Sequence, residues 1–185
     1  MDKYMYLVFS KTDTWLSRAI YFLGNLQYPH TSISFDDSFN QLYSFGRTNP
    51  NNPLSGGFVV ESFYDGMFKK CSNSRCAVYR IKITEEQYNN LLKEVERFKK
   101  EQNKFRYNFL GLFGVILHRP IIRKHHYFCS QFVSEVMINS KVYDTTKIPA
   151  LISTSDLYDM EDKELVYEGY IHDYKDFLYQ RTVNN

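Results

Sequence analysis

Hydrophobic and polar residues alternate over several short segments of this chain, and this alternation is the period of a β-strand with one buried face. The clearest segment is 77–83, where Ala77, Tyr79, Ile81 and Ile83 share one face. Similar segments bounded by turn residues predict further strands over residues 4–10, 30–35, 41–46, 58–63 and 165–170. Only a polar turn separates the second of these from the third, so we expect those two strands to form a hairpin.

Other segments repeat hydrophobic residues every three or four positions, which is the period of an α-helix. Thr84 and Gln87 match a capping box and precede a long amphipathic segment that ends near Phe98. A second amphipathic segment covers residues 14–24. Residues 109–117 are apolar throughout. They are far fewer than the ~20 residues needed to span a bilayer, so we expect a helix that is buried in the protein instead.

Together these elements predict a single α+β domain over residues 1–185, in which an antiparallel sheet packs against helices. The chain is 43% hydrophobic and 17% aromatic, which suffices for a full core. Its net charge of +2 is too small to indicate a nucleic-acid partner. The chain starts without a long apolar segment and has three cysteines, so we expect reduced thiols and a cytoplasmic location.

One cysteine lies at the predicted start of a helix. From Cys129 onward, Phe132, Val133 and Val136 fall on one helical face, which places the thiol in the first turn and facing inward. Free N–H groups and the positive end of the helix dipole lower the pKa of such a thiol. The same N–H groups can stabilise the oxyanion of an acyl-transfer intermediate. The alternative is an ordinary buried core cysteine.

A cysteine nucleophile requires a base, and His30 is the first candidate. It opens a predicted strand whose face also carries the small residues Ser32 and Ser34, which leave room for a reacting group. A solvent-facing strand with an incidental histidine is the alternative. Two residues on neighbouring strands are candidates to orient the imidazole, namely Ser44 and Glu61. Glu61 is the stronger acceptor, although a solvated carboxylate explains it equally well.

Further polar residues suggest other sites. Cys71 and Cys76 form half of a possible zinc site, and His125 with His126 would have to complete it. The spacing is loose, so we expect no metal and no cofactor. The basic residues between 119 and 126 form either a solvated loop or a positive potential that favours an anionic substrate near Cys129. His126 is a rival base. Because it lies only three residues before Cys129, we expect its side chain to point away from the thiol.

Two segments resemble the circularly permuted branch of the papain-like, NlpC-type superfamily, which includes lecithin retinol acyltransferase. They are residues 28–35 (YPHTSISF) and 127–136 (YFCSQFVSEV). In this branch the histidine strand precedes the cysteine helix, as in this chain. Residues 42–47, 107–112 and 152–157 are also similar to the group, so the resemblance extends over most of the chain.

The resemblance implies a permuted papain-like topology, with Cys129 as nucleophile, His30 as base and Ser44 at the third polar position. It also implies a cysteine hydrolase, an amidase or peptidase that forms an acyl-thioester. The expected substrate is a peptide, a cell-wall fragment or an acyl ester. Two alternatives remain, namely an acyltransferase or thioesterase acting on lipid-like substrates, and a non-catalytic binding domain that keeps the fold.

Overall fold

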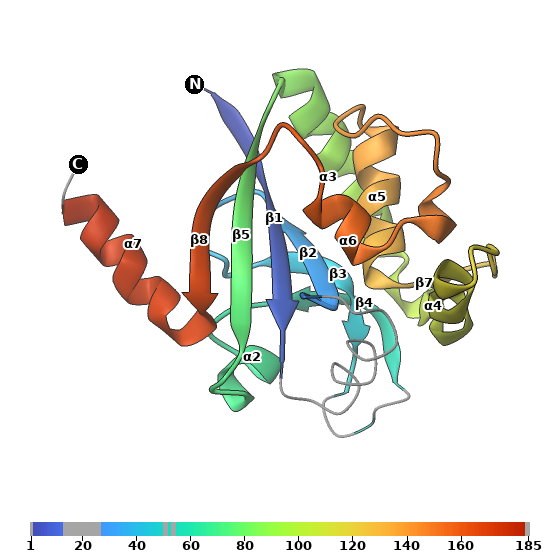
Figure 1. The fold of residues 1–185 in the computed structure, drawn as a ribbon, viewed down its shortest axis with the longest axis horizontal. Coiled ribbons are helices and arrows are strands. Elements are labelled where there is room, and N and C mark those ends of the chain that lie inside the picture. Colours follow the sequence, from blue (N-terminus) through green and yellow to red (C-terminus); the bar gives the residue numbers. More distant parts are fainter. Residues whose placement is uncertain (1, 13–26, 50–51, 53–54, 184–185) are drawn as a thin grey trace.

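The computed structural model describes residues 2–12, 27–49, 52 and 55–183. Its centre is a six-stranded sheet in which every paired neighbour is antiparallel. The strand order is β4-β3-β2-β1-β5-β8 (Figure 1). The strands are β1 (Lys3–Lys11), β2 (His30–Ser34), β3 (Leu42–Arg47), β4 (Gly56–Glu61), β5 (Arg75–Ile83) and β8 (Glu164–Tyr170). The predicted α+β class, with an antiparallel sheet packed against helices, is therefore confirmed.

Helices lie on both faces of this sheet, and a short parallel ladder joins two loops outside it (Figure 1). The helices are α2 (Gly66–Lys70), α3 (Glu85–Lys100), α4 (Phe109–Ile116), α5 (Cys129–Asn139), α6 (Thr154–Tyr158) and α7 (Tyr174–Val183). The ladder consists of β6 (Arg106–Tyr107) and β7 (His126–Tyr127). Single 3-10 turns cover η1 (Gln102–Lys104), η2 (Pro149–Leu151) and η3 (Ile171–Asp173).

The larger core lies between the sheet and helices α3 and α5. Its centre is a cluster of aromatic rings in which Phe132 of α5 lies 4.9 Å from Phe98 of α3 and 5.5 Å from Phe45 of β3, measured between ring centroids. All three side chains are fully buried. Aromatic contacts of this kind add specific geometry to hydrophobic burial. They fix the position of α5, and hence of Cys129 at its first residue, relative to the sheet.

A second core covers the opposite face of the sheet. Phe39 lies at its centre, 4.9 Å from the rings of both Phe63 and Tyr174. Helices α2 and α7 contribute to this layer through Phe68 and Tyr174. Because both faces are covered, the consecutive β5 residues Cys76, Ala77 and Val78 are all buried. The expectation of a half-buried strand is therefore wrong for this part of β5.

Most predicted elements are formed. The hairpin of β2 and β3 is present, and the capping box is complete, with Gln87 N–H donating to Thr84 Oγ1 at 3.1 Å and Thr84 N–H to Gln87 Oε1 at 2.8 Å. The predicted helix at 14–24 lies outside the described residues. Helices α2 and α7 had no clear signal in the sequence.

The helix predicted at residues 109–117 forms as α4, but the expectation that it is buried is wrong. Leu110 is 52% exposed and Phe113 is 50% exposed. Within the described ranges, no helix is long and apolar enough to cross a bilayer.

Candidate catalytic site

Cys129 is the first residue of α5, as the sequence pattern predicts. The residue before it, Phe128, is extended and provides no side-chain cap, so the N–H groups of the first helical turn have no competing side-chain acceptor there. The cysteine is only 2% exposed. Its sulfur therefore lies at the positive end of a helix dipole and is shielded from bulk water.

The β6–β7 ladder brings a tyrosine to this cysteine. Tyr107 pairs with Tyr127, two residues before Cys129, and its side chain lies close enough to the thiol for Cys129 to raise the pKa of the phenol. Two glycines of β4 make room for this segment. A Cβ on Gly56 would lie 2.5 Å from Cβ of Tyr107, and one on Gly57 would lie 2.8 Å from the Phe105 carbonyl oxygen. The adjacent glycines are therefore required for the close approach of β6 to β4.

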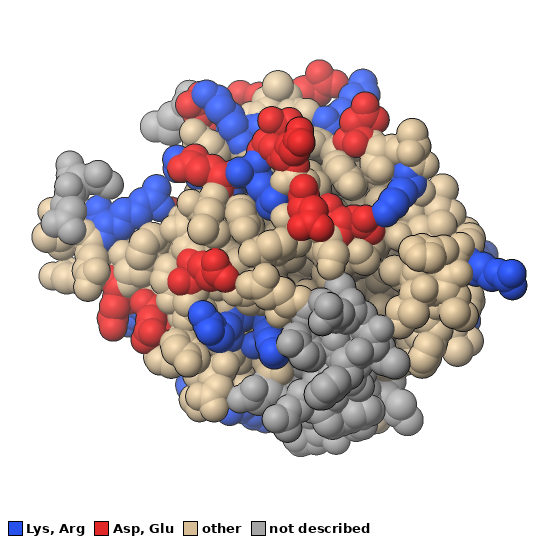
Figure 2. Space-filling model, viewed as in Figure 1, with Lys and Arg blue, Asp and Glu red and all other residues tan. Residues whose placement is uncertain are grey.

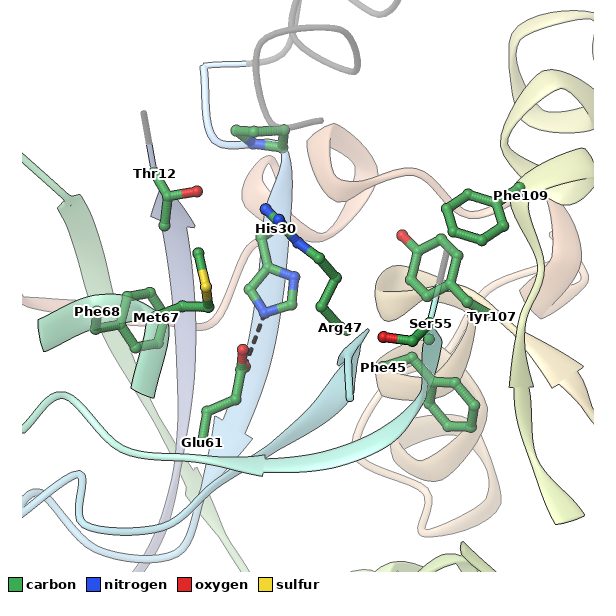
Figure 3. Close-up of a pocket in the computed structure, with 13 residues that line it drawn as sticks. Thr12, His30, Phe45, Arg47, Ser55, Glu61, Met67, Phe68, Tyr107 and Phe109 are labelled. Carbon is green, nitrogen blue, oxygen red and sulfur yellow. Dashed lines mark hydrogen bonds and ion pairs between the residues drawn. The ribbon is translucent and has the colours of Figure 1, made fainter. Parts of the chain in front are cut away.

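His30 is held by a carboxylate from β4, which lies two strands away on the sheet. Its Nε2 lies 2.9 Å from Oε2 of Glu61, the last residue of β4 (Figure 3). The two side chains are only 23% and 19% exposed. Because Nε2 is engaged with Glu61, Nδ1 is the ring nitrogen left to face Cys129.

The backbone on both sides of His30 also contacts the cysteine. Cys129 Sγ lies 3.9 Å from the carbonyl oxygen of Pro29, to which the thiol donates. The N–H groups of Thr31 and Ser130 lie near the sulfur and favour its ionised form, which lowers the pKa of Cys129. The sulfur thus lies between the start of β2 and the start of α5. This arrangement stabilises a thiolate with two backbone donors in addition to the imidazole.

These contacts shift both pKa values toward an ion pair. Burial by itself would raise the pKa of Cys129, but the hydrogen bond and charge of His30, together with the N–H groups of Thr31 and Ser130, lower it overall. Burial would likewise lower the pKa of His30. The charge of Glu61 and the hydrogen bonds with Cys129 and Glu61 outweigh burial and raise it well above its ordinary value. The arrangement therefore favours thiolate and imidazolium together.

The pKa of Tyr107 is also raised, first by burial and then by the charge of Cys129 and the hydrogen bond to it. The phenol consequently stays protonated near neutral pH and can donate a hydrogen bond. Sequence reasoning assigned no role to Tyr107. The two-residue strands that position it are too short to give a periodic pattern, so only their three-dimensional pairing reveals it.

The expectation that Ser44 orients His30 is wrong. Its hydroxyl donates to the carbonyl oxygen of Thr31 at 2.6 Å and is fully buried. Glu61 occupies the position beside the imidazole instead. The physical reason is the length of the side chain. The short serine on β3 bonds only to the backbone of the neighbouring strand, whereas the longer glutamate on β4 extends to the imidazole ring.

The other polar candidates do not join this site. His126 directs Nδ1 to the carbonyl oxygen of Lys124 at 2.7 Å, away from the cysteine as expected. Cys71 follows α2 and Cys76 lies inside β5. Across the part of the chain that the structure describes, no three histidine, cysteine or acidic residues gather in a way that could hold a metal ion.

A cleft opens beside His30 (Figure 3). It encloses about 700 Å³ of empty space when its open mouth is included. Cys129 is not part of the cleft surface, but His30 and Tyr107, the two side chains that contact its thiol, both line it. The remaining lining is mostly apolar with one cation, and comprises Thr12, Pro29, Phe45, Gly46, Arg47, Ser55, Gly56, Glu61, Met67, Phe68 and Phe109.

The chain is similar in fold to one solved structure, described as the metalloprotein YiiX from Escherichia coli O157:H7. The alignment covers 91% of this chain and 98% of that one, with a TM-score of 0.58 and 15% sequence identity. No protein-family model matches the chain, and no curated protein matches it. At this identity the likeness supports the fold alone.

Proposed function

We propose that the chain is a cysteine hydrolase with a permuted papain-like topology, in which Cys129 is the nucleophile, His30 the base and Glu61 the residue that orients the base. The observation that carries the proposal is the sequence of contacts from Glu61 through His30 to a buried cysteine with a lowered pKa. A perturbed pKa pair beside a cleft is typical of a catalytic site. The chain order fits the topology, because β2 precedes α5.

In the first half of the proposed reaction the Cys129 thiolate attacks a substrate carbonyl carbon and forms a carbon–sulfur bond. The negative charge moves to the carbonyl oxygen. The Ser130 N–H and the Tyr107 hydroxyl are the donors we assign to that oxygen, since both lie near the sulfur. The tetrahedral intermediate then collapses, and the leaving group departs with the proton from Nδ1 of His30.

The second half reverses these roles. His30, now neutral, removes a proton from water, and the resulting hydroxide attacks the thioester carbonyl carbon. The carbon–sulfur bond breaks, the carboxylic acid product leaves, and the proton on His30 restores the ion pair with the thiolate. Glu61 stabilises the imidazolium in both halves and keeps Nδ1 directed at the sulfur.

The cleft also bears on the substrate. Phe45, Phe109 and Met67 provide apolar contacts for the acyl side of the scissile bond. Arg47 is the one cation in the lining, and it forms no ion pair with any residue in the described ranges. A guanidinium in such a place binds carboxylates. The proposed substrate is therefore an amide or ester whose acyl portion is apolar and carries an anionic group.

The proposal is tested with p-nitrophenyl acetate, an activated ester that needs no specific recognition. The wild-type protein should release nitrophenolate in a burst and carry one acetyl group on Cys129, located by mass spectrometry of the quenched protein. Cys129→Ala should lose both signals, whereas Cys71→Ser should keep them. If Cys129 stays unacetylated and the burst is equal in both variants, the domain is not a cysteine hydrolase and the binding-domain alternative takes its place.

A further inference from the structure

Helix α4 and the loop after it expose an unusual share of the hydrophobic side chains. Of eleven large hydrophobic residues exposed in the described part of the chain, five fall between residues 110 and 122. We call these five residues the α4 surface, namely Leu110, Phe113, Ile116, Leu117 and Ile122. A clustered apolar patch of this kind marks an interaction site, whereas single exposed hydrophobic residues do not.

The α4 surface is one rigid unit. Leu110, Phe113 and Leu117 recur every three or four residues and so lie on one side of α4. The loop folds back on the helix through two hydrogen bonds, from Arg119 N–H to the Gly114 carbonyl oxygen at 2.9 Å and from Asn108 Nδ2 to the Ile121 carbonyl oxygen at 2.9 Å. The exposed side chains are therefore presented together.

The charged residues of the segment that carries this surface are all basic. Between Glu101 and Glu135 the sequence contains no acidic residue, but it contains five lysines and arginines. Arg119, Arg123 and Lys124 directly follow α4, and all three are exposed. Since the whole chain has a net charge of only +2, this segment is far more basic than the rest. Figure 2 shows the side of the molecule that carries α4, at the right, as largely uncharged surface with Lys or Arg at its outer edge.

We propose that the α4 surface docks on an anionic lipid bilayer. Apolar side chains flanked by lysine and arginine match the two parts of a membrane interface, the acyl boundary and the negative headgroups. The interaction is peripheral, because the helix is much too short to cross a bilayer. The cleft lies next to this surface, because Phe109 at the start of α4 lines the cleft together with Tyr107.

Other partners fit the surface less well. Two copies of this chain in a symmetric dimer would bring the same basic residues face to face, which is repulsive. A nucleic acid would match the cations but not the apolar centre, because its binding relies on phosphate contacts and base stacking. The bilayer satisfies both features at once.

The experiment is co-sedimentation of the full chain with vesicles, and it requires no catalytic turnover. We expect binding to vesicles of phosphatidylcholine with phosphatidylglycerol, weakening as salt is raised, and little binding to phosphatidylcholine alone. Arg123→Gln with Lys124→Gln should weaken binding by about fivefold for each cation removed. The matched control, Lys69→Gln with Lys70→Gln on α2, removes two exposed cations elsewhere and should bind like the wild type.

A second pair of variants tests the apolar part. Phe113→Ser with Leu117→Ser should weaken binding at least about tenfold. Tyr179→Ser with Val183→Ser on α7 removes two hydrophobic residues that are at least as exposed, and vesicle binding should be unchanged. Failure of the wild type to bind anionic vesicles, or equal losses in test and control variants, overturns the proposal. A wild-type dimer that dissociates in the Phe113 and Leu117 variant overturns it in favour of a second copy.

Discussion

Cys129 and Cys76 are both buried, at 2% and 0% exposed, but their surroundings drive their pKa values in opposite directions. The pKa of Cys76 is raised strongly, first by burial and then by the charge of Glu168, against which Arg75 has little effect. The pKa of Cys129 is lowered although burial acts on it as well. Burial alone therefore makes a thiol inert, and the groups around the sulfur decide whether it becomes a nucleophile.

The two elements explain the difference. Cys76 lies inside β5, where the backbone N–H and carbonyl groups are used in pairing with β1 and β8, and its side chain packs among apolar residues such as Val8. Cys129 begins a helix, where N–H groups have no partner in the helix itself. The fold then adds an imidazole held by a carboxylate. Removing the imidazole or its carboxylate should therefore move Cys129 toward the behaviour of Cys76.

The largest effect is expected from His30→Ala. Loss of the imidazolium removes both the partner of the thiolate and the group that protonates the leaving group. Acylation by p-nitrophenyl acetate should fall toward the upper end of roughly 10²–10⁴-fold, the range for a general acid–base residue. Stopped-flow measurement of nitrophenolate release checks this. A loss of less than about tenfold would mean that the backbone donors alone activate Cys129.

Tyr107→Phe should have the next largest effect. The phenol lies beside the sulfur, and in the proposed reaction it donates to the oxyanion. The rate of ester acylation should therefore fall by about 10²-fold, the low end for one oxyanion donor. Alkylation of Cys129 by iodoacetamide passes through no oxyanion, so its rate should change much less than the rate of acylation. Comparing the two rates in one variant separates these roles. Equal losses in both reactions would make Tyr107 a structural residue.

Glu61→Gln should shift the pH profile of acylation. The imidazolium must persist for reaction, so the rate rises with pH as Cys129 ionises and falls as His30 loses its proton. Without the Glu61 charge the pKa of His30 falls, so the alkaline limb should move to lower pH. Ser44→Ala is the matched control and should leave the profile in place, because its hydroxyl serves only the Thr31 carbonyl. A shift in the Ser44 variant instead would return the orienting role to that residue.

The smallest effect is expected from Arg47→Gln. This variant should not change the pKa of Cys129 or the burst with a neutral ester. For an ester whose acyl chain ends in a carboxylate, KM should rise by about two- to fivefold, as expected for a partly exposed ion pair, with kcat unchanged. Steady-state kinetics with the hemisuccinate and acetate esters of p-nitrophenol check this. An equal rise in KM for both esters would exclude a charge-specific role for Arg47.

The fold was largely predictable because its strands and helices carry strong local signals. The capping box at Thr84 and the alternation around Ile81 mark their elements without any tertiary information. The prediction that α4 is buried is wrong. An apolar sequence indicates that a helix contacts a hydrophobic environment, but it does not tell whether the rest of the chain or another partner provides that environment. Helix α7 was missed because Tyr174, its one buried anchor, does not repeat along the helix.

The site was predictable only where local structure determines it. Cys129 at a helix start and His30 at a strand start were found from the residues that follow each of them. The roles of Glu61 and Tyr107 depend on which strands become neighbours and on the room left by Gly56, and no local pattern records these. The choice of Ser44 over Glu61 failed because it relied on proximity between strands rather than on side-chain reach.

The most direct test of the central claim is the rate of iodoacetamide alkylation at Cys129 and Cys76 as a function of pH, measured on the native Cys71→Ser protein by peptide mass spectrometry. We expect Cys129 to react at pH values well below the ~8.5 at which a free thiol ionises. Cys76 should remain unmodified until the protein is unfolded. If Cys129 instead requires alkaline pH, or reacts no faster than Cys76, the ion pair with His30 does not form and the proposed hydrolase is contradicted.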